Sequence, residues 1–400
     1  MNHPTIQVRL SKKTIRPMIQ DIYKNARPLH LGVGLLAILA LLSGCSSDDS
    51  SDDSLPEDTT GAFLQPVFHM SGVETRSIIS GTSTTEGEGR INEVKLFVTK
   101  AEDGYTPYGG VGTAGNAGLS TFTYQSVGSG GNDWVGDPTV NLSSVKARIY
   151  AYSPANAILT KSSTNTAHTI ATTLPVHQNF YGGKGWDSDA TDYMYGSASN
   201  TVGEAIAITA SNTTPSGGSP SSGTYQPEIY LQHALARLSF TMQSATGRSV
   251  NATYDYVKKI TLKTSSNAFT TGTGTMQIAD GALGGGTKVA ELTFTPKNDA
   301  SSNTTAILCG AVGVPVEVGY GLVAPLASVD MTLTVVVGKR DDTTDDRTLS
   351  ANLSQITWKR GHTHKIQITL SNRAITVNAD IRPWTESGSA GTGDVKPGGY

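Results

Sequence analysis

The sequence is poor in cysteine and in charge for its 400 residues, and each shortage excludes a class of protein. Its two cysteines, Cys45 and Cys309, cannot build the disulfide framework that stabilises small secreted domains. Charged residues make up 16% of the chain and the formal net charge is −3, so no basic surface of the kind that binds nucleic acid is expected. We therefore expect neither a disulfide scaffold nor a nucleic-acid partner.

Helical periodicity is also lacking, because no long segment after residue 60 repeats its apolar residues every 3.6 positions. Apolar and polar residues instead alternate, which is the pattern of half-buried strands. The alternating runs are Val94–Val98, Val145–Ala151, Leu238–Met242, Met331–Val335, Ile366–Leu370 and Ile375–Ile381. Stretches rich in Gly, Ser, Thr and Asn separate them, as turns require. The pattern predicts an all-β protein of antiparallel β-sandwiches.

The mature chain is longer than one core usually serves, so we expect two domains. The linker-like segment Ser211–Gly223, made of Ser, Gly, Thr, Asn and Pro, divides it near its middle. We predict an N-terminal domain over 61–215, a C-terminal domain over 216–384 and a Gly/Ser-rich tail over 385–400. The same segment is also compatible with a long hairpin loop inside one domain.

Motifs for catalysis are missing as well: the chain has no Gly-x-Ser-x-Gly, HExxH or CxxC sequence. The stretch Gly110–Gly115 matches a dinucleotide fingerprint by letter but lacks the strand before it and the helix after it. His362 and His364 would share one face of a strand, without an evident third metal ligand. We expect no enzyme, no cofactor and no metal, and a buried, inert thiol at Cys309.

The N-terminus has the order of a secretory signal peptide: basic residues, a short apolar run from Leu31 to Leu42, and small residues. The apolar run is shorter than the roughly 20 residues that span a bilayer as a helix. The sequence Leu-Ser-Gly before Cys45 looks like a lipobox, which predicts lipidation of Cys45 and a signal peptide over 1–45, with Met1 or Met18 as the start. Residues 46–60, almost all Ser, Asp and Glu, predict a disordered acidic tether to the outer membrane.

A removable strand is predicted after the tether. Phe63–Met70 is apolar enough to be a strand, and Pro66 suggests that it lies at a sheet edge. Arg76 then opens a polar loop that precedes the next strand, and exposed loops are preferred sites of proteolysis.

These features, taken in order, resemble the fimbrillins, the subunits of type V pili of Bacteroidia-type bacteria. The resemblance covers nearly the whole mature chain and rests on the lipobox, the strand ending Glu74-Thr75-Arg76, the strand Ile91–Val98, the run Tyr230–Leu238, Trp358 with Gly361, and the closing Pro383-Trp384. It implies two transthyretin-like β-sandwich domains in tandem. It also implies a location on the cell surface, in a pilus.

The resemblance further implies assembly by donor-strand exchange with other pilus subunits. An Arg-specific protease would cut after Arg76, leaving Ser77 as the new N-terminus, and the first strand would leave. Arg90 is the second choice of cleavage site. The C-terminal strand Ile375–Trp384 would be the donor, with Ile375, Val377, Ala379 and Ile381 as its apolar teeth.

Two questions stay open from the sequence. Because the tail after Trp384 lacks alternation, the chain is either a stalk subunit or a tip subunit. The alternative function is a surface glycan-binding lipoprotein of a nutrient-uptake system, with Trp134, Trp186, Tyr105 and Tyr108 as exposed loop aromatics that stack on sugar rings. A tip subunit that binds a host or glycan ligand would combine both functions.

Overall fold

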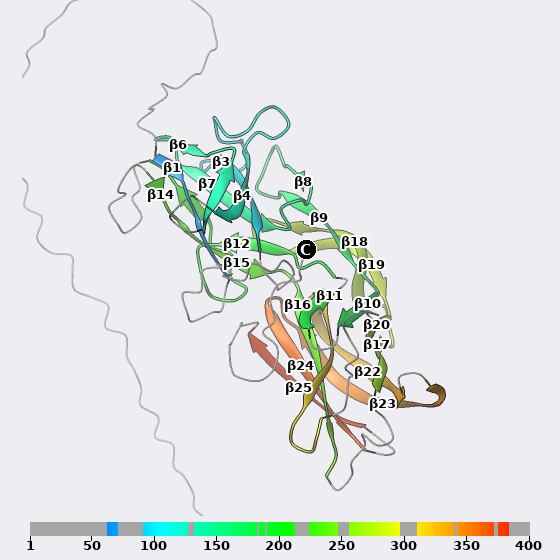
Figure 1. Ribbon diagram of the computed structural model, residues 1–400. Coiled ribbons are helices and arrows are strands. Elements are labelled where there is room, and N and C mark those ends of the chain that lie inside the picture. Colours follow the sequence, from blue (N-terminus) through cyan, green and yellow to red (C-terminus); the bar gives the residue numbers. More distant parts are fainter. Residues whose placement is uncertain are drawn as a thin grey trace, which may run out of the picture. The chain divides into compact units, whose positions relative to one another are not determined.

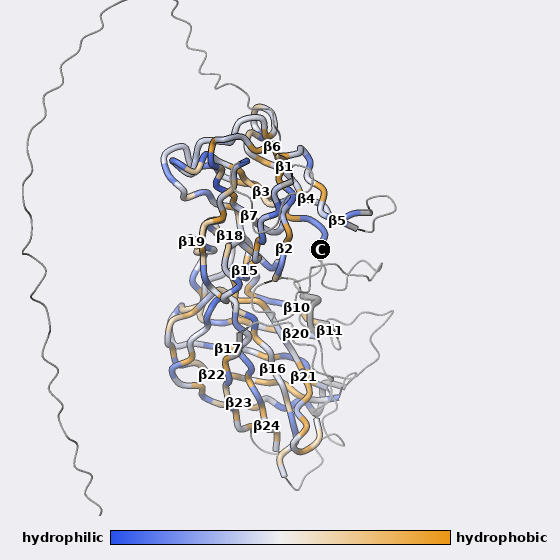
Figure 2. The backbone as a smooth tube through the Cα atoms, turned by 90° about the vertical axis from the view of Figure 1, so that its left-hand side faces the viewer, coloured by the Kyte–Doolittle hydropathy of each residue, from blue (hydrophilic) through white to orange (hydrophobic). Residues whose placement is uncertain are grey.

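Strands are the only regular secondary structure in the residues that the structure describes, and this confirms the all-β prediction (Figure 1). The structure is a computed structural model and describes residues 62–70, 91–126, 132–181, 184–188, 190–212, 224–246, 256–296, 310–339, 342–371 and 375–383. Hydrophobic and hydrophilic residues alternate along many of the strands, as the sequence predicts (Figure 2). Within these residues there is no helix long and apolar enough to cross a membrane.

An eight-stranded sheet and a small three-stranded sheet hold the first strands of the chain. The order of the large sheet is β2 (Val67–Met70), β15 (Glu228–His233), β12 (Met194–Ser197), β7 (Ala147–Ser153), β3 (Glu93–Lys100), β4 (Leu119–Ser126) and β5 (Asn132–Asp137), with β13 (Ile208–Ala210) beside β7. The small sheet has the order β14 (Thr224–Tyr225), β1 (Ala62–Leu64) and β6 (Asn141–Leu142). The segment predicted to be removable therefore contributes one strand to each sheet.

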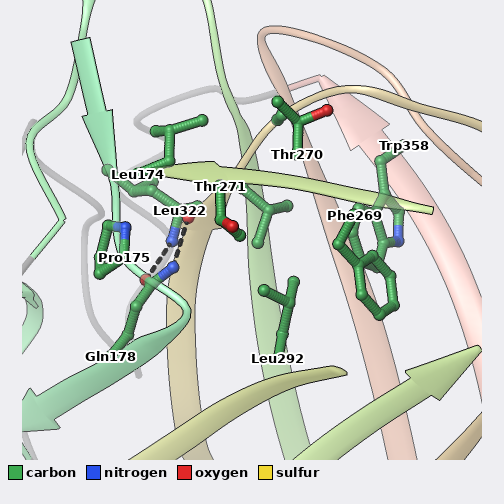
Figure 3. A pocket seen from close by; sticks show the side chains of 11 residues that line it. Leu174, Pro175, Gln178, Phe269, Thr270, Thr271, Leu292, Leu322 and Trp358 are labelled. Atoms are coloured by element: carbon green, nitrogen blue, oxygen red, sulfur yellow. Dashed lines mark hydrogen bonds between the residues drawn. The ribbon is translucent and has the colours of Figure 1, made fainter. Parts of the chain in front are cut away.

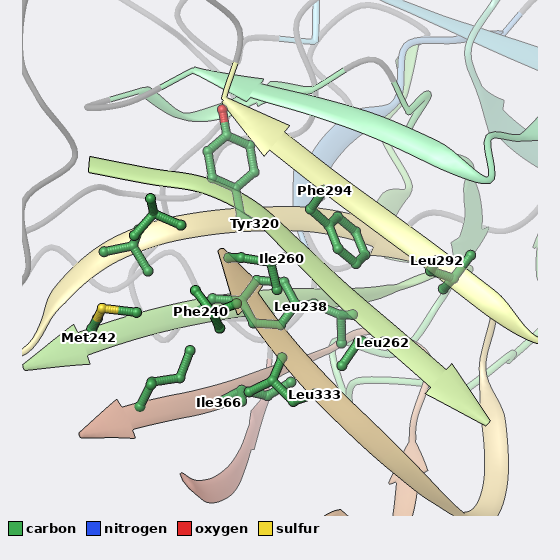
Figure 4. Close-up of a cluster of buried hydrophobic side chains, with 14 of the residues drawn as sticks. Leu238, Phe240, Met242, Ile260, Leu262, Leu292, Phe294, Tyr320, Leu333 and Ile366 are labelled. Carbon is green, nitrogen blue, oxygen red and sulfur yellow. The ribbon is translucent and has the colours of Figure 1, made fainter. Parts of the chain in front are cut away.

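Two further sheets enclose the largest hydrophobic core. One has the order β11 (Lys184–Ser188), β10 (His177–Tyr181), β20 (Glu291–Pro296), β17 (Tyr256–Thr264), β22 (Leu326–Lys339) and β23 (Asp342–Trp358). The other has the order β21 (Val316–Val323), β16 (Ala236–Ser244), β24 (His362–Leu370) and β25 (Ile375–Pro383). Alternate residues of the facing strands meet between them, including Leu238, Phe240, Ile260, Leu262, Phe294, Leu333 and Ile366 (Figure 4).

Close packing in this core requires glycine on β21. A Cβ added at Gly321 would lie 2.3 Å from the ring of Phe294, and one at Gly319 would lie 2.8 Å from Ile260. Both distances are shorter than real side chains adopt, so the missing side chains leave the space that the neighbouring residues fill.

A fifth sheet joins strands from the two halves of the chain. Its order is β19 (Leu283–Val289), β18 (Phe269–Gln277), β9 (Thr169–Leu174) and β8 (Leu159–Thr160). β10 likewise pairs with β20, and β15 pairs with β2 and β12, so strands on both sides of the predicted boundary share sheets. Residues 213–223 of the predicted linker lie outside the described residues, and the division into two domains stays a prediction.

Candidate functional site

The segment predicted as one removable strand, Phe63–Met70, forms two short strands. β1 and β2 are separated at Gln65 and Pro66, where proline has no N–H to donate to a sheet. β2 is an edge strand of the eight-stranded sheet, as Pro66 suggested, whereas β1 lies between β14 and β6. The prediction of a single strand was therefore wrong, because a proline in its middle interrupts the hydrogen-bonding pattern.

Backbone hydrogen bonds hold this segment along its length. β2 runs parallel to β15, and Phe68 lies opposite Ile229. The N–H of Leu64 donates to the carbonyl of Val140 at 2.9 Å, and that of Val67 donates to Pro227 at 3.0 Å. Loss of the segment would leave β6, β14 and β15 with backbone groups that need new partners.

The buried side chains of the segment recur at every second residue. Leu64, Pro66, Phe68 and Met70 are buried, the residues between them are half-buried, and Phe63, which precedes them, is exposed. Leu64, Phe68 and Met70 belong to one core cluster with residues of β3, β4, β5, β7 and β15. The segment thus inserts a row of four apolar side chains, termed teeth, into the protein interior.

Phe68 is the largest of these teeth and has no exposed surface. Its ring centroid lies 4.7 Å from that of Trp134 on β5 and 6.1 Å from that of Phe122 on β4, both in edge-to-face geometry. β2 and β5 are opposite edges of the sheet, so the sheet curls until its two edges meet over this aromatic cluster. Gly136 makes room for it, since a Cβ there would lie 2.6 Å from the Phe122 ring.

The other face of β2 carries polar contacts. The His69 ring stacks on Tyr230 with centroids 5.0 Å apart. Burial lowers the pKa of His69, and the negative charge of Glu228 opposes that shift. The side-chain amide of Gln65 donates to the carboxylate of Asp133. The segment is therefore tied to β15 and β5 through side chains as well as backbone.

The predicted donor residues lie on β25, which is an edge strand and, among the strands that the structure describes, pairs with β24 alone. Its pairing runs from Leu370 opposite Ile375 to His362 opposite Pro383. The exposed fraction of the teeth rises along the strand: Ile375 is 7% exposed, Val377 is half-buried, Ala379 is exposed, and Ile381 is 44% exposed. The structure brings the four residues onto one strand, which belongs to a different sheet from β1 and from β2.

The opposite edge of that sheet, β21, is protected by a side chain. The Gln178 amide donates to the carbonyl of Leu322 at 2.7 Å and accepts from its N–H at 3.0 Å, as a neighbouring strand would (Figure 3). The hollow beside Gln178, lined also by Leu174, Phe269 and Trp358, has room for about one water molecule. Such a hollow is too small for a cofactor or a sugar.

The structure does not describe several of the residues for which the sequence predicts a role. Cys45, Arg76, Ser77, Arg90 and Cys309 lie outside the described residues.

The prediction that Trp134 and Tyr108 are exposed aromatics for sugar stacking was wrong. Trp134 lies on a strand and is 3% exposed, and Tyr108 is buried and donates to the carbonyl of Val145. The side chain of Trp186 lies outside the described residues, and Tyr105 is half-buried.

His362 and His364 do not face a common ligand site. His364 is buried and accepts a hydrogen bond from the Lys359 N–H at 2.9 Å, while His362 bonds to the Arg360 carbonyl. No cluster of His, Cys, Asp or Glu that could hold a metal occurs among the described residues.

The aromatic cluster around Phe68 was not anticipated from the sequence. The alternation Leu64, Pro66, Phe68, Met70 is visible there, but Phe122 and Trp134 belong to strands distant in sequence. Only the curl of the sheet brings these rings to Phe68.

Comparison with known proteins gives one family and several similar folds. The sequence profile of the family described as fimbrillin-like matches residues 91–384, well over half of the chain. No curated protein matches the sequence.

Three similar solved structures come from species of Bacteroides and Porphyromonas. A fimbrial protein from Bacteroides vulgatus is 14% identical over 81% of this chain and 99% of its own, with a TM-score of 0.49. A candidate cell adhesion protein from Bacteroides uniformis is 14% identical over 83% of this chain and 100% of its own, with a TM-score of 0.46. The tip fimbrial protein Mfa3 from Porphyromonas gingivalis is 11% identical over 75% of this chain and 97% of its own, with a TM-score of 0.33.

Proposed function

Because this chain belongs to the fimbrillin-like family, we propose that it is a subunit of a cell-surface pilus, exported as a lipoprotein anchored through Cys45. An Arg-specific protease cuts after Arg76, Ser77 becomes the N-terminus, and the segment 62–70 is released. A strand of a neighbouring subunit then takes its place, and β25 is the strand that this chain donates. The outer membrane holds the subunit before assembly, and the finished polymer supports adhesion.

The observation that carries this proposal is how residues 62–70 pack into the core and pair with neighbouring strands. The segment supplies Leu64, Phe68 and Met70 to the core and closes the edge of β15. Arg76 follows Met70 by a few residues, so a cut there frees the segment from the rest of the chain. An empty seat exposes apolar side chains and unpaired backbone groups to water, so its refilling by another strand is strongly favourable.

β25 has the properties that a donated strand needs. Among the described strands it pairs with β24 alone, and the side chain of Ile381 is 44% exposed. Its release breaks one line of strand pairing and leaves the other strands of that sheet in place. A strand so attached can be exchanged at lower cost than one from the middle of a sheet.

N-terminal sequencing of the protein from surface appendages sheared off the native cells tests the proposal. We expect high-mass polymers whose chains start at Ser77. Arg76→Ala should abolish this start and reduce polymer at least about tenfold, whereas Arg90→Ala should leave both unchanged, because Arg90 is followed directly by the fully buried Ile91.

The opposite result would be a single acylated species that retains everything from Cys45 and never enters a polymer. That result would refute strand removal and favour the glycan-binding alternative.

A further inference from the structure

The groove that residues 62–70 occupy holds buried side chains of unequal size. Four buried residues at a two-residue spacing define four pockets, at Leu64, Pro66, Phe68 and Met70. The third pocket is shaped by an aromatic ring, because Phe68 is fully buried against Trp134 and Phe122. Any strand that replaces the segment must fill this space or leave a void in a close-packed core.

The chain's own β25 carries four teeth at the same spacing but no aromatic residue. With the teeth in register, the place of Phe68 would receive Ala379 if β25 runs in the direction of β2, and Val377 if it runs in reverse. Shifting β25 by one tooth brings an isoleucine there, from Ile381 or Ile375. Trp384, which follows the strand in sequence, is at an even position, whereas the four apolar residues are at odd positions. In a continued strand it would therefore belong to the opposite face.

We propose that this groove selects a donor strand from a different subunit, one with an aromatic side chain at the tooth that enters the Phe68 pocket, over a copy of its own β25. The inference rests on the proposed function. Its physical basis is a difference in cavity filling: alanine, valine or isoleucine at the place of Phe68 lacks the aromatic ring that contacts Trp134 and Phe122. The chain would then follow one kind of subunit in the pilus and donate β25 to another, rather than polymerise with itself.

Competition between peptides on the processed full chain tests the selection. The protein is cut with an Arg-specific protease, and synthetic peptides compete for the groove with a fluorescent peptide of residues 62–70. The competitors are the β25 sequence 375–383, its Val377→Phe and Ala379→Phe variants, and Asn378→Phe as a control on the opposite face.

We expect one of the two tooth variants to bind at least about tenfold more tightly than unchanged β25, and the Asn378→Phe control to bind no better. Which variant gains also gives the direction of the inserted strand. In the 62–70 peptide, Phe68→Val should weaken binding by about the same factor.

Two results overturn the inference, and they differ in meaning. If unchanged β25 competes as well as both tooth variants, the pocket does not select, while strand exchange itself stands. If the processed chain binds neither the 62–70 peptide nor any variant, no exchangeable groove exists, and the proposed function fails together with the inference.

Discussion

Phe68 is the residue on which the seat of the first segment most depends. Its ring is surrounded by core residues and contacts two other rings, so truncation removes contacts on all sides. We expect Phe68→Ala to lower the free energy of unfolding of the uncut protein by about 3–5 kcal/mol. Urea denaturation measures this, with Phe63→Ala as the matched control, because Phe63 is 37% exposed. A loss for Phe68→Ala no larger than that for Phe63→Ala would contradict the prediction, because the buried position would then contribute no more than the partly exposed one.

His364 makes stability depend on pH. Burial lowers its pKa to about 4, and its neutral ring accepts the hydrogen bond from Lys359, with the charges of Lys359 and His362 also disfavouring protonation. Since the unfolded chain takes up this proton near pH 6.5 and the folded chain does not, stability falls as the pH drops from about 6.5 to about 4.

The His364→Gln variant isolates this effect, which is at most about 3 kcal/mol. We expect the urea midpoint of the variant to fall less between pH 7 and pH 4.5 than that of the unaltered protein. Parallel decreases in the two proteins would assign the pH dependence to other groups, such as His69 and His168, whose pKa values burial also lowers.

At the scale of elements, the attachment of β25 to β24 decides whether the strand can be donated. Gln367 and Asn378 lie directly opposite each other in this pair. A Gln367→Cys, Asn378→Cys disulfide would hold β25 in its own sheet. We expect the pilus content of cells with the double variant to fall at least about tenfold and to recover when a reductant is present during assembly.

The single variant Asn378→Cys controls for the substitution itself. Normal pilus formation by the oxidised double variant would show that β25 stays in its own sheet during assembly. The donor would then have to be another segment.

Element by element, the sequence predicts strand positions better than strand partners. β24 and β25 contain the predicted runs Ile366–Leu370 and Ile375–Ile381, because one apolar face and one polar face give a clear period of two, although β24 begins earlier, at His362. β16 contains the alternating run Leu238–Met242 but is buried on both faces, so that its polar residues Ser239 and Thr241 are buried as well. The break at Pro66 was not predicted. Proline can occur in an edge strand, but it interrupts a strand at a position where a backbone N–H is needed for pairing.

On the scale of the whole molecule, the two halves of the chain are interlocked. The described residues all belong to one compact unit, Pro56–Tyr400. Arg360, in the turn between β23 and β24, donates to the carbonyl of Gly203 at 2.9 Å and to that of Asp280, and lies 5.4 Å from the ring centroid of Tyr195. β9 and β10 add strand pairing across the same junction.

We therefore expect a single unfolding transition in denaturant, with tryptophan fluorescence and circular dichroism changing together. Arg360→Ala should lower the free energy of unfolding by about 2 kcal/mol without splitting the transition, since it removes hydrogen bonds and a cation–π contact. Lys365→Ala, at an exposed position of β24, is the control. Two separate transitions in the unaltered protein would show that the junction does not couple the halves.

The sequence by itself determined the all-β class, through alternation, and the family, through the profile over 91–384. Both depend on local pattern or on residues in order along the chain. Only the tertiary structure decided which strands share sheets, that residues 62–70 divide into β1 and β2, and that Trp134 is a buried neighbour of Phe68 rather than an exposed aromatic. These features arise from contacts between residues far apart in sequence, formed when the sheet curls and its edges meet, and the alternation of a strand does not specify its partners.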